Sequence, residues 1–272
     1  MCSPKDKAGK KYWSKLWEES TIPSPIDPSE RGRNTYRHRR RHELFCEFFA
    51  DMETQERDLL EIGGARSRWL PYFAQEFGFQ VTAMDYSEPG CELAQGILTN
   101  AGIEGTVVCA DAFSPPSEMA EAFDVVASFG VVEHFQDTAS CIKAFSFFLR
   151  PGGLLITFVP HLKGLPGLIT RIVNREAYER HVPLGVADLK NAYAQAGLHV
   201  VRCEYFLFFN RGTSLLRGMD MHLLSSKAKA LLVGALDATS KLVAMLDDYL
   251  GVRLPSNRLT SPRVLCIGRK HS

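Results

Sequence analysis

The chain has 272 residues, of which 45% are apolar and 23% are charged, and its formal net charge at pH 7 is +1. This length and composition predict a globular protein with a sizeable core and argue against a disordered or fibrous chain. Proteins that bind nucleic acids or acidic membrane surfaces usually have a strong positive electrostatic field, and a net charge so near zero argues against one here.

The cysteines and the N-terminus indicate the compartment. Seven cysteines are scattered along the chain and no two form a CxxC pair, so we expect neither a disulfide framework nor a zinc site. Residues 1–13 lack the apolar core of a signal peptide, and no uncharged stretch approaches the length that crosses a bilayer. We therefore expect a cytoplasmic protein that does not enter a membrane.

Residues 1–55 are expected to form a helical N-terminal extension. The run KYWSKLW places Tyr12, Trp13 and Trp17 at helical spacing, and a proline-rich stretch follows. A second, amphipathic helix then has an apolar side made of Leu44, Phe45, Phe48, Phe49 and Met52. We interpret its basic run, YRHRRRH at 36–42, as a solvated face; an RNA-binding arm is the alternative.

From about residue 57 short apolar runs alternate with helical patterns, which is typical of βαβ units and a parallel sheet. Strands are predicted at 58–64, 80–85, 105–111, 123–130, 152–160, 198–209 and 263–269. Helices are predicted at 67–78, 91–102, 138–153 and 186–197. The expected fold is α/β, with a Rossmann-like, doubly wound, mostly parallel seven-stranded sheet.

A helical insertion is expected at about 210–260, between the last two strands. Its long helix, 224–250, has apolar residues in register but also carries Lys227, Lys241 and Asp247, so it does not span a membrane. We expect it to cover the domain, roof the pocket or meet a second subunit. The predicted domains are the extension, 1–55, and one domain that includes this insertion, 56–272.

The first predicted strand runs into the turn Gly63-Gly64-Ala65-Arg66-Ser67. A dinucleotide fingerprint needs glycines for the approach of a pyrophosphate and for close helix–strand packing. Ala65 and Ser67 stand at or near those places, which disfavours a pyrophosphate. A ligand without phosphates, such as S-adenosylmethionine (SAM), tolerates an added Cβ there more easily.

Residues 59–160 resemble the class I SAM-dependent methyltransferases, including those of quinone and natural-product biosynthesis. Five motifs occur in the expected order: Glu61-Ile62-Gly63, Asp85, CADAF (109–113), FDVVASFGVVEHF (123–135) and LRPGGLLITFVP (149–160). The chain departs from the family at Ala65, where most members have a second glycine. This difference affects the expected pose of the methionyl tail more than the identity of the cofactor.

The resemblance implies that SAM is the cofactor and suggests which residues hold it. Asp85 would accept hydrogen bonds from both ribose hydroxyls, and Asp111 would contact the adenine amino group. The remaining predicted cofactor residues are Glu61, Gly63, Ala65, Tyr86, Ala112 and Phe129. Arg66 and Arg68 could meet the SAM carboxylate or remain solvated.

Methyl transfer requires aligned reactants, exclusion of water and, for a hydroxyl acceptor, removal of a proton. His134 is expected beside the sulfonium, as the base or as a residue that holds the loop. His181 is a second catalytic candidate, or a packing residue at a helix start. No metal site is expected, although Glu133 and His134 could join a Mg²⁺ site in some quinone-type relatives.

The predicted substrate contacts are Tyr12, Trp13, Trp17, His161 and Tyr178. The three N-terminal aromatic residues could form a lid over SAM and the acceptor, or simply pack. We expect a small-molecule acceptor, aromatic or apolar, methylated on oxygen or otherwise on nitrogen, sulfur or carbon, with no nucleic acid partner. A homo-oligomer formed through the helical extensions is possible. The alternatives are a non-catalytic partner protein with this fold and an NAD(P)-dependent oxidoreductase.

Overall fold

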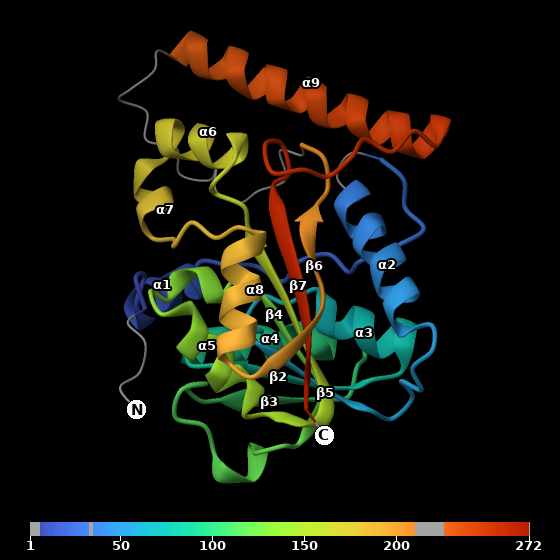
Figure 1. Cartoon of the computed structure of the whole chain (residues 1–272), viewed down its shortest axis with the longest axis vertical. Helices are drawn as coiled ribbons and strands as arrows, with labels where there is room; N and C mark the ends of the chain where they lie inside the picture. The colour runs from blue at the N-terminus through green and yellow to red at the C-terminus, as the bar shows by residue number, and fades with distance from the viewer. Residues whose placement is uncertain (1–5, 33–34, 210–225, 272) are drawn as a thin grey trace.

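The computed structural model describes residues 6–32, 35–209 and 226–271. Within them lies a seven-stranded sheet of order β3-β2-β1-β4-β5-β7-β6, in which β7 runs antiparallel to both neighbours (Figure 1). The strands are β1 (Asp58–Ile62), β2 (Gln80–Asp85), β3 (Gly105–Cys109), β4 (Phe123–Phe129), β5 (Leu149–Pro160), β6 (Leu198–Phe206) and β7 (Arg263–Lys270). The predicted Rossmann-like α/β fold is confirmed.

Helices cover both faces of the sheet because neighbouring strand residues point to opposite sides. Leu59 and Val125 pack in one core, whereas Leu60 and Val126 pack in the other. The first face carries α2 (Tyr36–Phe49), α3 (Trp69–Phe77) and α4 (Glu88–Asn100); the second carries α5 (Thr138–Ser146) and α8 (Val186–Gln195). In Figure 1 α2 and α3 lie to the right of the sheet, and α5 and α8 to its left.

The strand order reverses between β1 and β4, and open α/β sheets bind their ligands at the carboxyl ends of strands at such a point. The turn after β1 is fixed there because the amides of Gly63 and Gly64 both donate to the Met84 carbonyl, at 2.8 and 3.1 Å. Gly63 has φ +77°, and a Cβ on it would lie 2.4 Å from Val131 Cγ2. Glycine is therefore required at this position.

Two parts of the chain differ from the sequence-based prediction. The helix predicted over 138–153 ends at Ser146, because β5 begins at Leu149, which pairs with Phe123 of β4. Two short helices, α6 (Leu165–Val173) and α7 (Arg175–Glu179), follow β5 and were not predicted.

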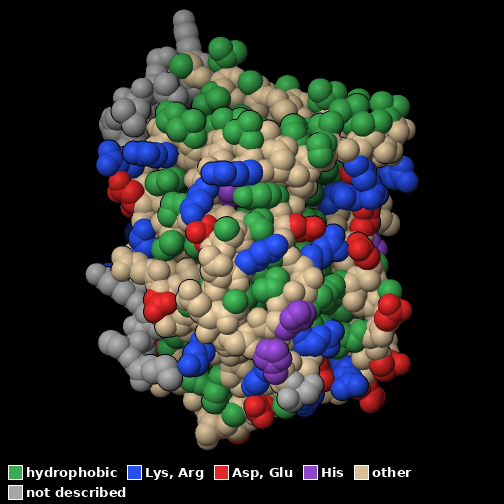
Figure 2. All heavy atoms as spheres, viewed as in Figure 1, with side chains coloured by type: hydrophobic (Ala, Val, Ile, Leu, Met, Phe, Trp, Pro, Cys, Tyr) green, Lys and Arg blue, Asp and Glu red, His purple; other side chains and the backbone are tan. Residues whose placement is uncertain are grey.

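The insertion contains α9 (Ser226–Leu250), and its residues 210–225 lie outside the described part of the chain. Within the described residues no helix combines the length and apolarity that crossing a membrane requires. α9 lies across one end of the molecule, where Figure 2 shows hydrophobic side chains gathered. Its exposed apolar residues are Leu231, Leu242, Met245, Tyr249 and Leu250. The predicted subunit contact through this region stays a prediction.

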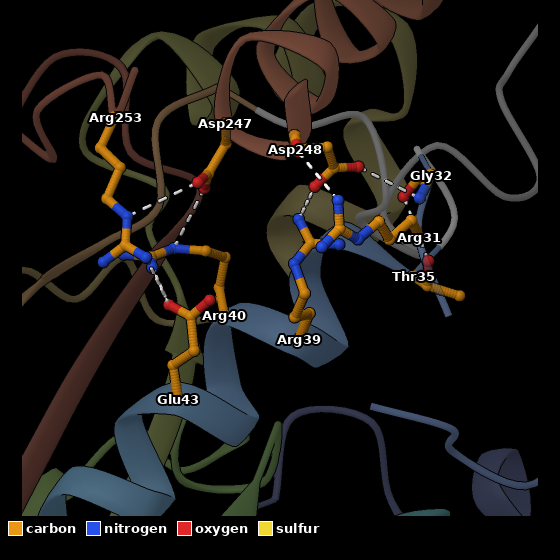
Figure 3. A network of polar contacts seen from close by, with 9 residues as sticks. All are labelled: Arg31, Gly32, Thr35, Arg39, Arg40, Glu43, Asp247, Asp248 and Arg253. Atoms are coloured by element: carbon orange, nitrogen blue, oxygen red, sulfur yellow. Dashed lines mark hydrogen bonds and ion pairs between the residues drawn. The ribbon is translucent and has the colours of Figure 1, made fainter. Parts of the chain in front are cut away.

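The basic run 36–42 is not a solvated face, so that interpretation was wrong. Arg39 forms an ion pair with Asp248 of α9, and Arg40 lies 3.5 Å from Asp247 (Figure 3). Asp248 also accepts a hydrogen bond from the Gly32 amide at 3.1 Å. These contacts join α2, α9 and the loop before α2. The acidic partners stand about 200 residues further along the chain, beyond the reach of any local pattern.

Candidate functional site

Two adjoining cavities open at the carboxyl edge of the sheet. The first, called the Asp85 cavity, has a volume of about 190 Å³, and its walls include Asp85, Asp111 and His134. The second, called the arginine cavity, has a volume of about 300 Å³, and its walls include Arg41 and Arg263. The two share Trp17, Gly63, Phe129 and Gly130. A long ligand can therefore cross the glycine turn from one cavity into the other.

Asp85 ends β2 with its carboxyl group in the wall of the first cavity, and the residue is 7% exposed. One carboxylate oxygen accepts the Ser87 amide at 2.9 Å, and the amides of Ala65 and Tyr86 also bond to the group. Burial raises the pKa of Asp85 to about 6, against the opposing effect of these amides. Such a carboxylate is well placed to accept hydrogen bonds from a diol.

The far side of the Asp85 cavity suits a flat aromatic group. Ala112, Phe113 and Phe135 line it, with the two phenylalanine rings 4.8 Å apart. Asp111 is exposed at this end, and its Oδ1 accepts the Phe113 amide at 2.9 Å. Tyr86 also lines the cavity, and its hydroxyl donates to Asp6 Oδ2 at 2.6 Å.

Glu61 and Ala65, on either side of the two glycines, do not line the Asp85 cavity, and their assignment as cofactor contacts stays a prediction. Glu61 is buried beside the arginine cavity, where the Ser67 hydroxyl donates to it and burial raises its pKa to about 8. Ala65 is fully buried and lines neither cavity. A Cβ built on Gly90 of α4 would lie 2.8 Å from the Ala65 Cβ, so this methyl group faces α4. The alanine therefore leaves the ligand side of the turn open.

Helix α1 (Lys10–Glu18) covers the Asp85 cavity. Trp13 and Trp17 stack with their centroids 5.6 Å apart, and both line the cavity. Trp13 also meets the His134 ring edge-on at 4.9 Å. Ser14 Oγ lies 3.1 Å from Ser87 Oγ, which ties α1 to the start of α4. The geometry suits a cover that excludes water.

His134 and His181 are brought together, with ring centroids 4.5 Å apart. His134 Nδ1 lies 3.1 Å from the Arg180 carbonyl and His181 Nδ1 faces the Ala177 carbonyl. A carbonyl oxygen only accepts, so in each neutral ring Nδ1 carries the proton and Nε2 keeps a free lone pair. Burial lowers the pKa of both rings, that of His181 to about 3.

Glu133 completes this cluster. It is buried, its Oε2 has no hydrogen-bond partner among the described residues, and burial raises its pKa to about 7. Glu133, His134 and His181 each offer one ligand atom within 4.8 Å of the others. Carboxylate oxygen and neutral imidazole nitrogen suit a divalent cation or a shared proton. The sequence indicated Glu133 and His134 as a pair, but it did not predict that His181 lies beside them.

The structure does not bring Tyr12, His161 and Tyr178 to the walls of either cavity. The Tyr12 hydroxyl accepts from Arg180 at 3.1 Å. His161 is buried, with its ring nitrogens 3.2 and 2.9 Å from the Leu184 and Arg258 carbonyls. Tyr178 lies under the Arg171 guanidinium at 6.0 Å. Their assignment as substrate contacts stays a prediction.

Sequence reasoning missed the arginine cavity. Arg37 and Arg41 follow the same helical face as Phe45, at i, i+4 and i+8, and Phe45 is fully buried. Because residues four apart share a face of a helix, this spacing could have predicted that the two arginines point towards the core. By contrast Arg66 and Arg68 hold the proline-rich segment 21–25 through its carbonyls.

Comparison with known proteins places the chain among enzymes. A family model described as a methyltransferase domain matches residues 36–202. The ubiquinone biosynthesis O-methyltransferase of Caulobacter sp. (strain K31) is 34% identical over 113 residues, which cover 42% of this chain and 44% of that protein. The chain thus spans less than half the length of the curated relatives it matches.

Solved structures agree with the fold. The cyclase SpnF superposes with a TM-score of 0.59 at 17% identity, covering 99% of this chain and 97% of that one. A SAM-dependent methyltransferase from Archaeoglobus fulgidus gives a TM-score of 0.52 at 18% identity, covering 85% of this chain and 94% of that one. At these identities the likeness shows the shared architecture.

Proposed function

The chain belongs to the methyltransferase-domain family, whose cofactor is SAM, and we propose that it transfers a methyl group from SAM to a small-molecule acceptor. The observation that carries the proposal is the buried Asp85 carboxylate at the end of β2, facing a cavity at the switch point of the sheet.

The residues present fit this cofactor. Asp85 would hold the ribose hydroxyls, and Asp111 with Phe113 would hold the adenine. The methionyl tail would cross Gly63, which lines both cavities, into the arginine cavity. No pyrophosphate is required anywhere along this path.

The bound cofactor supplies a methyl group already activated on a sulfonium sulfur. The protein then has to align the acceptor and keep water out, which can account for roughly 7–11 kcal/mol of a barrier in the best-aligned cases. Trp13 and Trp17 cover the Asp85 cavity, and Phe129 and Gly130 line both cavities. These are the proposed positioning roles.

We assign proton removal from a hydroxyl acceptor to His134. Its Nδ1–H is held by the Arg180 carbonyl, and burial keeps the ring neutral, so Nε2 can accept a proton. The deprotonated acceptor oxygen would then receive the methyl group, and S-adenosylhomocysteine would be released as the product. O-methylation of an aromatic acceptor is the form of the reaction that this arrangement favours.

The test is direct. Calorimetry should show binding of S-adenosylhomocysteine, the product of SAM, and Asp85→Ala should weaken it by one to two charge-assisted hydrogen bonds, about 1.5–3 kcal/mol each. Methyl-labelled SAM incubated with a panel of phenols, followed by mass spectrometry, should reveal a methylated product. A protein that binds neither SAM nor its product would refute the proposal.

A further inference from the structure

The helix α9 has an apolar side that packs on the domain and another that does not. Its inner side carries Leu236, Val243 and Ala244, which are buried, and the last two join the core that α2 and α3 also enter. The ion pair between Arg39 and Asp248 ties the helix to α2 (Figure 3). α9 is therefore held against one end of the molecule, and its other side faces away from the sheet (Figure 1).

The outer side of α9 is a continuous apolar stripe, called the outer stripe. Its six residues are all exposed: Leu231, Ala235, Ala238, Leu242, Met245 and Tyr249. The exposed fractions are 76% for Leu231, 70% for Tyr249 and 57% for both Leu242 and Met245. Single exposed apolar side chains are ordinary on a protein surface, whereas a continuous patch of them marks a binding surface.

The spacing of the outer stripe indicates a helical partner. From Leu231 to Tyr249 its residues follow one another at intervals of four and three in strict alternation. An apolar repeat that averages 3.5 residues forms the seam along which one α-helix packs on another. A helix that lies on a lipid surface instead has a polar face rich in basic residues, but α9 contains as many aspartates as lysines.

The sizes of the side chains indicate that the partner helix is α9 of a second copy. When two identical helices run antiparallel about a twofold axis level with residue 240, residues equally far from 240 in opposite directions face each other. Ala235 then faces Met245 of the second copy, and Ala238 faces Leu242. Small side chains thus meet large ones, as close packing requires. A parallel pair would instead set alanine against alanine and leave gaps.

The area of the outer stripe is sufficient for a dimer. A stable interface buries roughly 800 Å² on each partner, and in homodimers about 65% of it is apolar. The exposed fractions of the six side chains correspond to an apolar area on the order of 500–600 Å². The stripe alone therefore supplies the apolar share of such an interface.

We propose that two copies of this chain associate through their outer stripes, with the two α9 helices packed antiparallel. The proposal goes beyond methyl transfer and does not depend on it, because the six residues of the stripe lie outside the walls of both cavities. Each stripe covers the other, so the contact closes at two copies. The resulting assembly is a dimer.

Sedimentation velocity of the full chain measures the association, at about 1 to 100 µM, a range that brackets a micromolar Kd. The 30.4 kDa chain should sediment increasingly as a dimer as its concentration rises. Leu242→Glu should weaken the dimer at least about tenfold, because it buries an unpaired charge in the seam. Leu250→Glu is the matched control: Leu250 is 69% exposed on the same helix but lies about 100° around it from Tyr249, and the variant should associate as the wild type does.

The alanines test the antiparallel arrangement. Ala238→Leu should weaken the dimer at least about threefold, because the added side chain meets Leu242 of the second copy in a space that is already filled. In a parallel pair the same substitution would fill the gap between two alanines and strengthen the dimer. A tighter dimer in this variant would therefore overturn the antiparallel pairing.

Three other results would overturn the proposal. The first is a folded wild type that stays monomeric at about 100 µM. The second is a folded Leu242→Glu variant that dimerises as the wild type does; if this variant does not fold, as judged by circular dichroism, Met245→Glu replaces it. The third is a monomer that floats with vesicles of phosphatidylcholine and phosphatidylglycerol and loses this binding in Leu242→Glu, which would assign the outer stripe to a lipid surface.

Discussion

Replacing Asp85 by asparagine should make the protein more stable and less able to bind its cofactor. The folded structure holds this carboxylate 7% exposed at the end of β2. Its amide contacts do not fully offset burial, because its pKa is raised from 3.8 to about 6. An amide keeps the shape and one acceptor oxygen but carries no charge to desolvate.

The size of the effect follows from the pKa. A rise from 3.8 to about 6 means that ionised Asp85 destabilises the folded state by about 3 kcal/mol relative to its neutral form. Because the folded pKa is the higher one, this loss of stability is absent below pH 3.8 and complete above about pH 6. Asp85→Asn should therefore raise the free energy of unfolding by up to about 3 kcal/mol at pH 8 and by about half as much at pH 5.

Urea unfolding of both proteins without ligand, at pH 5 and pH 8, measures this difference. Asp111→Asn is the control, since Asp111 is exposed in the same cavity and should change stability by less than about 0.5 kcal/mol. S-adenosylhomocysteine should stabilise the wild type and stabilise Asp85→Asn far less. A variant that is less stable than the wild type at pH 8, or a gain that does not depend on pH, would refute the reasoning.

Three further outcomes are expected. His134→Ala should lower turnover of a phenol by about 10²–10⁴-fold at neutral pH, and the loss should shrink as the pH approaches the acceptor's own pKa; a pH-independent loss would assign His134 a structural role. Gly63→Ala should cost about 1–3 kcal/mol in urea unfolding, and less in a Val131→Ala background, where the 2.4 Å contact is removed; equal costs would show that backbone strain dominates. Asp248→Asn should lower the midpoint of thermal unfolding, and no effect in an Arg39→Gln background would confirm that this ion pair is responsible.

The positions of the strands could be predicted because a strand buried on both faces of a sheet consists mostly of apolar residues. The run QVTAMD gave β2 its observed bounds, Gln80–Asp85, and thereby placed Asp85 at the ligand edge. The predicted helix bounds were wrong where strand pairing with a distant segment outweighs the local helical pattern. Leu149 lies in a stretch with helical spacing but pairs with Phe123, so α5 ends early.

The arginine cavity shows why half of the candidate site escaped prediction. Successive residues of an α-helix point about 100° apart, so one basic run sends its side chains in several directions. Arg39 turns to the acids of α9, whereas Arg41, four residues before the buried Phe45, turns to the cavity. Taken as a block, the run resembles a solvated face, whereas the helical period places Arg37 and Arg41 on the same side as the buried Phe45. The wall of this cavity also includes Arg263 of β7, which stands more than 220 residues further along the chain, so no local pattern could bring it to Arg41. The net charge of +1 is a sum over the whole chain, so it gives no sign that several arginines gather in one cavity.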